Sequence, residues 1–378
     1  MSKNEISSII LILLLSFTLT LASGVRANLN SPTNLTESTE AEAHPSISDD
    51  GSKIAFQRYD GEYWEIFMIN SDGTGLKQLT SNEGYDRFPD ISGDGSKIAF
   101  QRYDGSDREL FVINSDGTGL TQLTDNNEED AEASISADGS KIAFTRALGD
   151  NMEIFVINSD GTGLTQLTNS PEADLNPSIS GDGGKIAFRR GLGKGIGIFV
   201  IDSDGTGLTQ LTTTSVDMNP SISGDGSKIA FHHYYDISVE KPEIFVVNSD
   251  GTGLKQLTSN FGDRYPSISG DGSEIAFQRG YDNDTEIFVV NSDGTGLTQL
   301  TNNNVEDEYP SIDHTGVNIV FEVNDDIYLV NYNSDAVITE PTPTPTPTLN
   351  VAVITVVSVI IGVVVVAGLF VFFKKRKH

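Results

Sequence analysis

Short apolar runs, each bounded by turn residues, recur along most of this chain. In one copy the runs are Ile91, Ile98–Phe100, Leu110–Ile113 and Gln122–Thr124, and Asp-Gly turns lie between them. Runs of this kind, rich in Ile, Val and Phe, are typical of β-strands, and the repeating region shows no helical period of comparable length. The pattern predicts an all-β protein made of units of four short strands.

The unit recurs at a nearly constant spacing. The hexapeptide Ser-Asp-Gly-Thr-Gly-Leu occurs six times, with 43 to 46 residues between successive copies. Its aspartates are Asp72, Asp116, Asp160, Asp204, Asp250 and Asp293. Four-stranded units with a period of about 40–45 residues, arranged around an axis, form a β-propeller.

The first half of the unit occurs once more than the hexapeptide does. It begins seven times, and its last copy, Pro310–Asn331, lacks a fourth strand. The segment Ser31–Thr36 at the other end has the layout of the missing strand. Ring closure leaves no unpaired strand edge. We therefore expect a seven-bladed propeller over residues 28–331, closed by the N-terminal strand; a six-bladed ring is the alternative.

The two ends of the chain predict attachment to a membrane. Residues 1–27 contain a short apolar run followed by small residues, as in a secretory signal peptide. Residues 332–349 include a Pro-Thr tract, which favours an extended stalk. Residues 350–373 are uncharged and long enough to span a bilayer as a helix, and the basic residues 374–378 should face the cytoplasm. We expect a single-pass cell-membrane protein with its propeller outside, in the style of archaeal surface proteins.

The repeated motif resembles a known family. The pattern Asp-x-x-Pro-x-x-Ser-x-Asp-Gly-x-x-Ile-Ala-Phe, followed by Ile-Phe-Val and a second Asp-Gly, is similar to the WD40-like PD40 repeats of TolB-type propellers. The resemblance covers about four-fifths of the chain. It implies the propeller fold but no particular activity, because function lies in sites built on a shared fold.

Composition narrows the classes of function. The chain has 54 acidic and 24 basic residues, a formal net charge of −30, and no cysteine. Nucleic-acid binding depends on Lys and Arg that neutralise phosphates, so nucleic acid is excluded as a partner. The five histidines and the many serines form no nucleophilic or metal-binding motif. We therefore expect a protein that is not an enzyme and needs no cofactor.

One acidic position recurs three residues before each first strand. Its members are Glu42, Asp86, Asp130, Asp174, Asp217, Asp263 and Asp307. First strands are innermost in a propeller, so these carboxylates are candidate ligands for Ca²⁺ at the channel mouth. The alternative is that each acid caps its own turn. A recurring Arg after Ile-Ala-Phe, as at Arg102, further predicts a cross-strand ion pair with a third-strand Glu such as Glu109.

The remaining candidates are sites of modification and recognition. Asn34 and Asn283 lie in N-glycosylation sequons. Aromatic residues gather in the variable hairpins between second and third strands, which share one face: Tyr59, Tyr63, Trp64, Tyr103, Tyr234, Tyr235 and Tyr281. They favour a surface module that binds an extracellular protein, an envelope layer or a glycan. The alternatives are an extracellular lyase or hydrolase that uses acids at the channel mouth, and a structural envelope component.

Overall fold

The structure is a computed structural model that describes residues 31–332, apart from residues 104, 194, 214–215, 236–240, 260–261 and 281–283. The predicted signal peptide, membrane helix and basic tail lie outside the described residues, as do Asn283, Tyr281 and all of the stalk except Tyr332. Tyr332 itself is only 2% exposed and packs into the core of the last blade. Among the residues described, no helix is long and apolar enough to cross a membrane.

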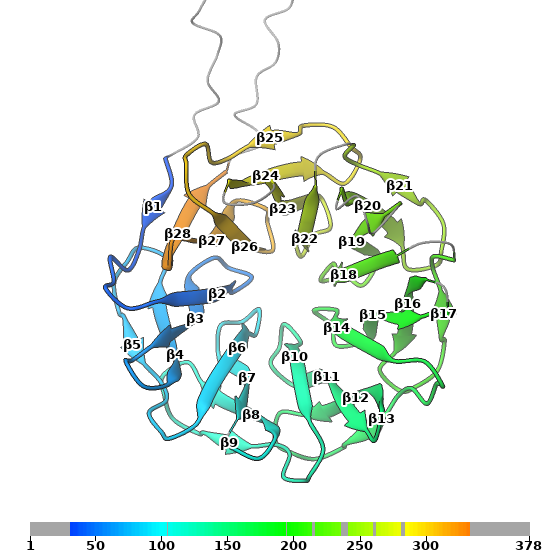
Figure 1. Cartoon of the computed structure of the whole chain (residues 1–378), viewed down its shortest axis with the longest axis horizontal. Helices are drawn as coiled ribbons and strands as arrows, with labels where there is room; N and C mark the ends of the chain where they lie inside the picture. Colours follow the sequence, from blue (N-terminus) through cyan, green and yellow to red (C-terminus); the bar gives the residue numbers. More distant parts are fainter. Residues whose placement is uncertain are drawn as a thin grey trace, which may run out of the picture. The chain divides into compact units, whose positions relative to one another are not determined.

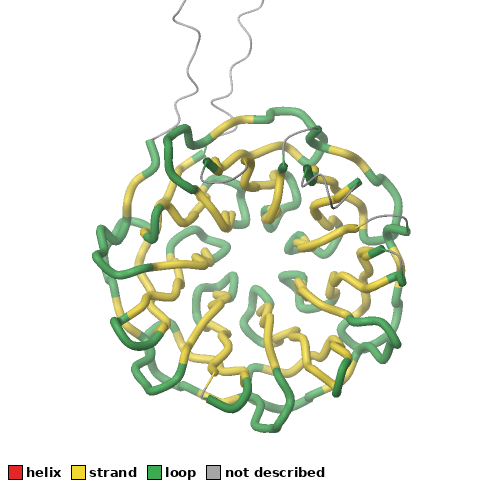
Figure 2. Tube along the Cα trace, viewed as in Figure 1, coloured by secondary structure: helices red, strands yellow, loops and turns green. Residues whose placement is uncertain are grey.

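Twenty-eight strands and no helix make up the described part of the chain, arranged as four-stranded blades around a central axis; one parallel pair, Ile196 with Val216, joins the fourth blade to the fifth (Figures 1 and 2). The first blade contains β2 Glu42–Ile47, β3 Lys53–Tyr59, β4 Trp64–Asn70 and β5 Lys77–Gln78; the second contains β6 Tyr85–Ile91, β7 Lys97–Tyr103, β8 Arg108–Asn114 and β9 Thr121–Gln122; and the third contains β10 Asp130–Ile135, β11 Lys141–Leu148, β12 Asn151–Asn158 and β13 Thr165–Gln166. The fourth blade contains β14 Asp174–Ile179, β15 Lys185–Gly191, β16 Ile196–Asp202 and β17 Thr209–Gln210, and the fifth contains β18 Val216–Ile222, β19 Lys228–Tyr234, β20 Glu243–Asn248 and β21 Lys255–Gln256. The sixth blade contains β22 Asp263–Ile268, β23 Glu274–Gly280, β24 Thr285–Asn291 and β25 Thr298–Gln299, and the seventh contains β26 Asp307–Ile312, β27 Asn318–Val323, β28 Asp326–Asn331 and β1 Thr33–Asn34.

The last blade takes its fourth strand from the N-terminal end of the described chain. β1 pairs antiparallel with β28, with Thr33 opposite Leu329 (Figure 1). The backbone N–H of Leu35 donates to the carbonyl of Ile327 at 2.9 Å. The Leu35 side chain packs against a cluster shared by the first and last blades. The predicted N-terminal strand is therefore the one that completes the seventh blade.

The hydrophobic core lies between neighbouring blades. The second-strand Phe of each Ile-Ala-Phe is fully buried and stacks on the third-strand Phe of its own blade, as Phe100 does on Phe111 at 5.7 Å. Each core cluster joins two blades: Leu110 of the second blade packs with Ile142 and Phe144 of the third. Alternation along each strand thus buries both faces of every sheet, and the repeat positions its first strands around the axis.

Candidate functional site

The first strand of every blade carries a β-bulge with a left-handed residue. In the second blade the register shifts between Arg87 and Asp90, and Phe88 has a φ of 54°. Seven of the ten non-glycine residues with positive φ in the described part occupy this position: His44, Phe88, Glu132, Asn176, Asn219, Tyr265 and Tyr309. Such a conformation strains a residue that has a Cβ, and strain of this kind gathers at functional sites. The bulge therefore marks a candidate site, repeated in every blade.

Side chains of the preceding blade stabilise the strained backbone. The N–H of Phe88 donates to Oε1 of Gln57 at 2.8 Å, and the N–H of Tyr309 donates to Oε1 of Gln278 at 3.1 Å. At Asn176 the acceptor is Oε2 of Glu132, at 2.7 Å. Each of these bonds satisfies a backbone donor that the bulge removes from strand pairing. The left-handed side chains are thus held on a rigid ring.

These seven side chains line one cavity at the central axis. Its volume is about 760 Å³, and it reaches the start of the third strands, where Arg108 and Met152 contribute to its wall. Below it the channel narrows to a space of about 150 Å³. A cavity of several hundred Å³ with aromatic and polar walls is the usual size and lining of a ligand site. We call the upper cavity the channel mouth.

Half of the channel mouth is aromatic. The ring of His44 lies 4.5 Å from the rings of both Phe88 and Tyr309, and Tyr309 lies 5.2 Å from Tyr265. His232 continues the series, 6.0 Å from Tyr265. Burial, aided by Arg87, lowers the pKa of His44 to about 4, so its ring is neutral at physiological pH. We call Phe88, His44, Tyr309 and Tyr265 the aromatic arc; it is uncharged, and Phe88 remains 41% exposed.

The other half of the channel mouth is polar. Glu132 accepts from the amide of Asn176 at 2.7 Å and from the hydroxyl of Thr145 at 2.8 Å. Arg189 in turn donates from Nε to Oδ1 of Asn176 at 2.5 Å. Asn219 stands at the equivalent position of the next blade. We call Glu132, Asn176 and Asn219 the polar arc, and its hydrogen-bonding groups face the aromatic arc across the axis.

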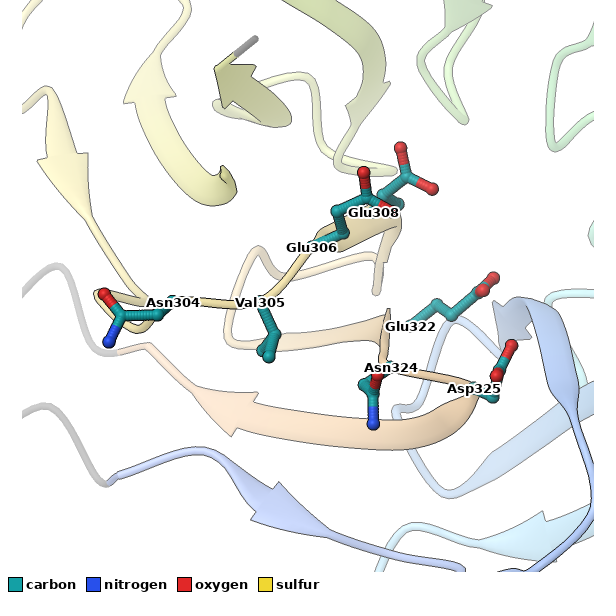
Figure 3. A pocket seen from close by; sticks show the side chains of 7 residues that line it. All are labelled: Asn304, Val305, Glu306, Glu308, Glu322, Asn324 and Asp325. Atoms are coloured by element: carbon teal, nitrogen blue, oxygen red, sulfur yellow. The ribbon is translucent and has the colours of Figure 1, made fainter. Parts of the chain in front are cut away.

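An acidic pocket adjoins the aromatic arc in the seventh blade. It has a volume of about 300 Å³ and is lined by Asn304, Val305, Glu306, Glu308, Glu322, Asn324 and Asp325 (Figure 3). Glu308 and Glu322 lie directly opposite each other on β26 and β27. Burial and the neighbouring Glu308 raise the pKa of Glu322 to about 7. In the other blades this cross-strand pair is never carboxylate against carboxylate.

The seven acids predicted as a channel ring lie behind the channel mouth rather than in its wall. All are 0 or 1% exposed, and none lines the cavity. Arg58, Arg102, Arg146, Arg190 and Arg279 pair with the acids of their own blades, and His233 contacts Asp217 at 2.7 Å. Metal binding by the whole ring stays a prediction. Six of the seven carboxylates contact an arginine or histidine of their own blade, whereas Asp307 has no cationic residue opposite it on the neighbouring strand.

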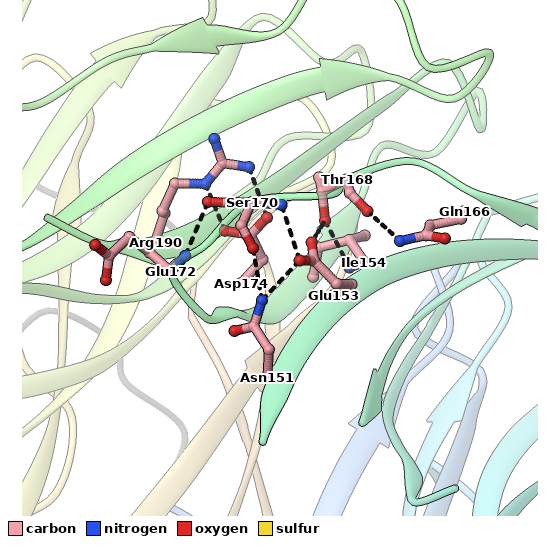
Figure 4. A network of polar contacts seen from close by, with 9 residues as sticks. All are labelled: Asn151, Glu153, Ile154, Gln166, Thr168, Ser170, Glu172, Asp174 and Arg190. Atoms are coloured by element: carbon pink, nitrogen blue, oxygen red, sulfur yellow. Dashed lines mark hydrogen bonds and ion pairs between the residues drawn. The ribbon is translucent and has the colours of Figure 1, made fainter. Parts of the chain in front are cut away.

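The predicted cross-strand Arg–Glu pairs belong to a larger network. Arg and Glu do lie opposite each other in the register, as Arg102 and Glu109 do, yet the direct ion pair of Arg102 is with Asp86 at 2.6 Å. The third-strand Glu instead accepts bonds at the junction with the next blade. Glu153 accepts from Thr168 at 2.6 Å and from the N–H of Ser170 at 2.8 Å, beside Asp174 and Arg190 (Figure 4). These polar groups tie one blade to the next.

One carboxylate interrupts a ring of serines at the narrow part of the channel. All members of the ring line the channel mouth, and four of them also line the narrow part: the ring consists of Ser46, Asp90, Ser134 and Ser311, which line both, and Ser178, Ser221 and Ser267. Each accepts the N–H of an isoleucine in the following blade, as Oδ2 of Asp90 does from Ile135 at 2.9 Å. Burial raises the pKa of Asp90 to about 6. The narrow part is therefore a hydrogen-bonded collar that joins neighbouring blades.

The aromatic residues predicted from the hairpins do not form a single patch: those of the first blade gather near its hairpin, whereas Tyr234 and Tyr235 contact His232 and His233 in the fifth blade. Tyr63 lies 5.4 Å from Tyr85, and the guanidinium of Arg87 lies 5.4 Å from the ring of Trp64. The hairpin pattern does not indicate the aromatic arc, because the residues of the arc lie in first strands rather than in variable loops. Aligning the seven repeats would have revealed it, since four of the seven residues at this position are aromatic or histidine: His44, Phe88, Tyr265 and Tyr309.

The fold and its repeats define a β-propeller, and comparison with known protein families identifies the family to which this propeller belongs. The family model described as the TolB beta propeller domain, PD40, matches residues 28–267, so the chain belongs to this family. Among curated proteins no match was found. Similar solved structures include an oligogalacturonate lyase in complex with manganese (16% identity, TM-score 0.67, 82% of this chain and 96% of that one). Another is TolB from Acinetobacter baumannii (21% identity, TM-score 0.56, 70% of this chain and 67% of that one). A third is a puromycin-hydrolysing peptidase from Mycobacterium tuberculosis (15% identity, TM-score 0.59, 79% of this chain and 52% of that one).

These neighbours correct one expectation. The lack of a catalytic motif predicted that the chain is not an enzyme. This prediction was wrong, because enzymes share the fold of this propeller. Oligogalacturonate lyases and peptidases share this propeller fold with the chain, although at low identity. The lack of a catalytic sequence motif therefore does not exclude an activity, because function lies in sites built on a shared fold.

Proposed function

We propose that the chain recognises a neutral saccharide at the channel mouth. The observation that carries the proposal is the uncharged aromatic arc opposite a polar arc of amides and a carboxylate. Sugar rings present C–H faces that pack on aromatic side chains and hydroxyl groups that bond to amides and carboxylates. The net charge of −30 and the acidic pocket disfavour an anionic polysaccharide.

The rigidity of the site supports recognition as well. The left-handed residues are fixed by bonds from neighbouring blades, so little side-chain freedom is lost when a ligand binds. The two ring contacts made by His44 also hold its ring between Phe88 and Tyr309. A preorganised arc of this kind favours binding more than a set of mobile loops would.

The proposal is tested by titrating the purified full chain with saccharides selected from a glycan array. Replacing Tyr265 and Tyr309 with Ala should weaken binding at least tenfold, because stacking contributes about 1 kcal/mol or more per ring. Tyr103→Ala, which removes an exposed aromatic residue from the rim outside the cavity, is the matched control and should bind as the wild type does. Equal affinity in the double variant and the wild type would refute a site at the channel mouth.

A second candidate function is cleavage of the bound saccharide. Glu308 and Glu322 lie directly opposite each other on neighbouring strands, which brings their side chains close together. Glycosidases that retain configuration use two carboxyl groups roughly 5 Å apart, one of them with a raised pKa. Glu322, with a pKa of about 7, is the candidate acid. Release of reducing sugar that is lost in Glu322→Gln, with binding retained, would establish this activity.

We also propose that the propeller is displayed outside a membrane. The support is the sequence at both ends: the signal-like residues 1–27, and the apolar residues 350–373 followed by a basic tail. Protease added to intact cells should release the propeller by cleavage within 332–349. A propeller that stays protected until the cells are lysed would reverse this topology.

A further inference from the structure

The seventh blade lacks the cation that faces the first-strand acid in the other six. In the sixth blade Arg279 donates to both oxygens of Asp263, at 2.6 and 3.0 Å. In the seventh blade the residue opposite Asp307 is Val323. The repeat therefore has a vacancy at a position where every other blade places an arginine or a histidine.

A second carboxylate reaches the same junction from the sixth blade. Asn303 links the two acids: its N–H donates to Oε1 of Glu286 at 2.6 Å, and its amide donates to Oδ2 of Asp307 at 2.8 Å. Asp307 is 0% exposed and Glu286 is 7% exposed. Among the described residues, Oδ1 of Asp307 and Oε2 of Glu286 have no hydrogen-bond partner. In the sixth blade the oxygen equivalent to Oδ1 is the one that receives Nε of Arg279.

We propose that a hard divalent cation, Ca²⁺ or Mg²⁺, binds between Glu286 and Asp307 where the other blades place their cationic side chain. Such ions prefer carboxylate oxygens, and sites with two carboxylates are completed by water. Two buried carboxylates without a counter-charge are strongly unfavourable, so a cation there stabilises the junction. The four acids of the neighbouring pocket attract cations to the site.

The site differs from a dedicated metal cluster. The described residues contain no group of three or more His, Cys, Asp or Glu arranged to hold a metal ion. A site of two carboxylates predicts weak affinity, of the order found in extracellular Ca²⁺ modules, at about 0.1–1 mM. The cation would link the sixth blade to β26, the innermost strand of the seventh blade, so its effect should appear in stability.

A shared proton is the competing account of the same pair. Burial, with a further contribution from Glu286, raises the pKa of Asp307 to about 6. A proton held between the two acids would leave well above pH 6, whereas a cation binds the ionised pair more tightly as the pH rises. Measurements at pH 8 therefore separate the two accounts.

The experiment compares Ca²⁺ and Mg²⁺ titrations of the full chain at pH 8 by calorimetry and thermal unfolding. The wild type should bind one cation and unfold at a higher temperature in its presence. Val323→Arg, which supplies the missing guanidinium, should lower the affinity at least tenfold, whereas Val323→Ala leaves the vacancy and should retain binding. Binding by Val323→Arg equal to that of the wild type, or no binding by the wild type up to about 10 mM, would overturn the proposal.

A second pair of variants decides the case if Val323→Arg does not fold. Asp307→Asn relieves the repulsion, so without cations it should be as stable as the wild type or more so, and its cation-induced shift in unfolding temperature should vanish. Asp263→Asn, at the same repeat position one blade earlier, loses a paired charge; it should be destabilised and keep the shift. Identical behaviour of the two variants would overturn the proposal.

Discussion

Closure of the ring depends on Asn34, and its replacement offers a sharp test of the fold. The Asn34 amide donates to Oδ2 of Asp326 at 2.8 Å and to the hydroxyl of Tyr328 at 3.3 Å. Its Oδ1 accepts the N–H groups of Thr36 and Glu37, both at 2.9 Å. Asn34→Ala removes all four bonds from β1, the short strand that completes the seventh blade.

The structure sets the size of the effect. The bond to the Asp326 carboxylate contributes about 1.5 kcal/mol, and the three neutral, partly exposed bonds contribute roughly 0.5 kcal/mol each, so the variant should lose about 3 kcal/mol. For a domain of this size 1 kcal/mol corresponds to roughly 2 °C, which predicts a fall in Tm of about 6 °C. The assay is thermal unfolding followed by circular dichroism.

A matched control separates closure from the general loss of an asparagine. Asn248 is the last residue of β20 and its amide donates one bond to the hydroxyl of Thr252, in the turn that follows, at 3.0 Å. Asn248→Ala should change the free energy of unfolding by no more than about 0.5 kcal/mol. An Asn34→Ala variant that melts with the wild type, or with Asn248→Ala, would refute the view that β1 fastens the ring.

Three further predictions follow from individual contacts. Arg102→Ala leaves the buried Asp86 unpaired and should destabilise the chain by about 3–5 kcal/mol in denaturant unfolding, whereas Arg108→Ala, from the exposed pair with Glu129, should change it by at most about 1 kcal/mol. The pKa of Glu322 is about 7 in the folded state and 4.5 in the unfolded state, so the stability that its protonated carboxyl contributes is present below pH 4.5 and is lost as the pH rises toward 7. Glu322→Gln should therefore make Tm nearly independent of pH between pH 5 and 8. A variant whose Tm falls with pH as steeply as that of the wild type would contradict this. Because the amide of Asn34 is bonded within the fold, mass spectrometry of protein from a glycosylating host should find a glycan on Asn283 and none on Asn34.

Much of the fold could be predicted from the sequence because the repeat is nearly regular. Asp-Gly turns and Ile-Ala-Phe runs recur with a fixed period, so the four-strand unit, the preferred blade number and the closing strand follow from spacing. The strand bounds do not: the first strands begin earlier than predicted and include the acids, as β6 includes Asp86, and the fourth strand of that blade is Thr121–Gln122 rather than Gln122–Thr124. Tyr332 lay beyond this signal: it was assigned to the stalk, yet it packs into the last blade. No repeat partner exists for it, and burial at the end of a repeat depends on tertiary contacts.

The candidate site was harder to predict, for a physical reason. The sequence indicated the seven acids as a ring, but which way a strand residue points depends on the bulge that follows it. The bulge turns the residue before each Pro, such as Phe88, toward the axis and leaves Asp86 behind it. Nothing in a single repeat signals a left-handed Phe, Tyr or His. By contrast, the aligned repeats do show that Val323 replaces the arginine or histidine of the other blades. Only the structure shows that Glu286 lies beside Asp307 at this position.

The most direct test of the central claim is a crystal structure of the full chain with the saccharide that binds best. The account predicts a sugar ring packed on Tyr265 and Tyr309, with hydroxyl groups bonded to Asn176 or Glu132. Electron density for the sugar on the outer hairpins near Trp64, with an empty channel mouth, would contradict it.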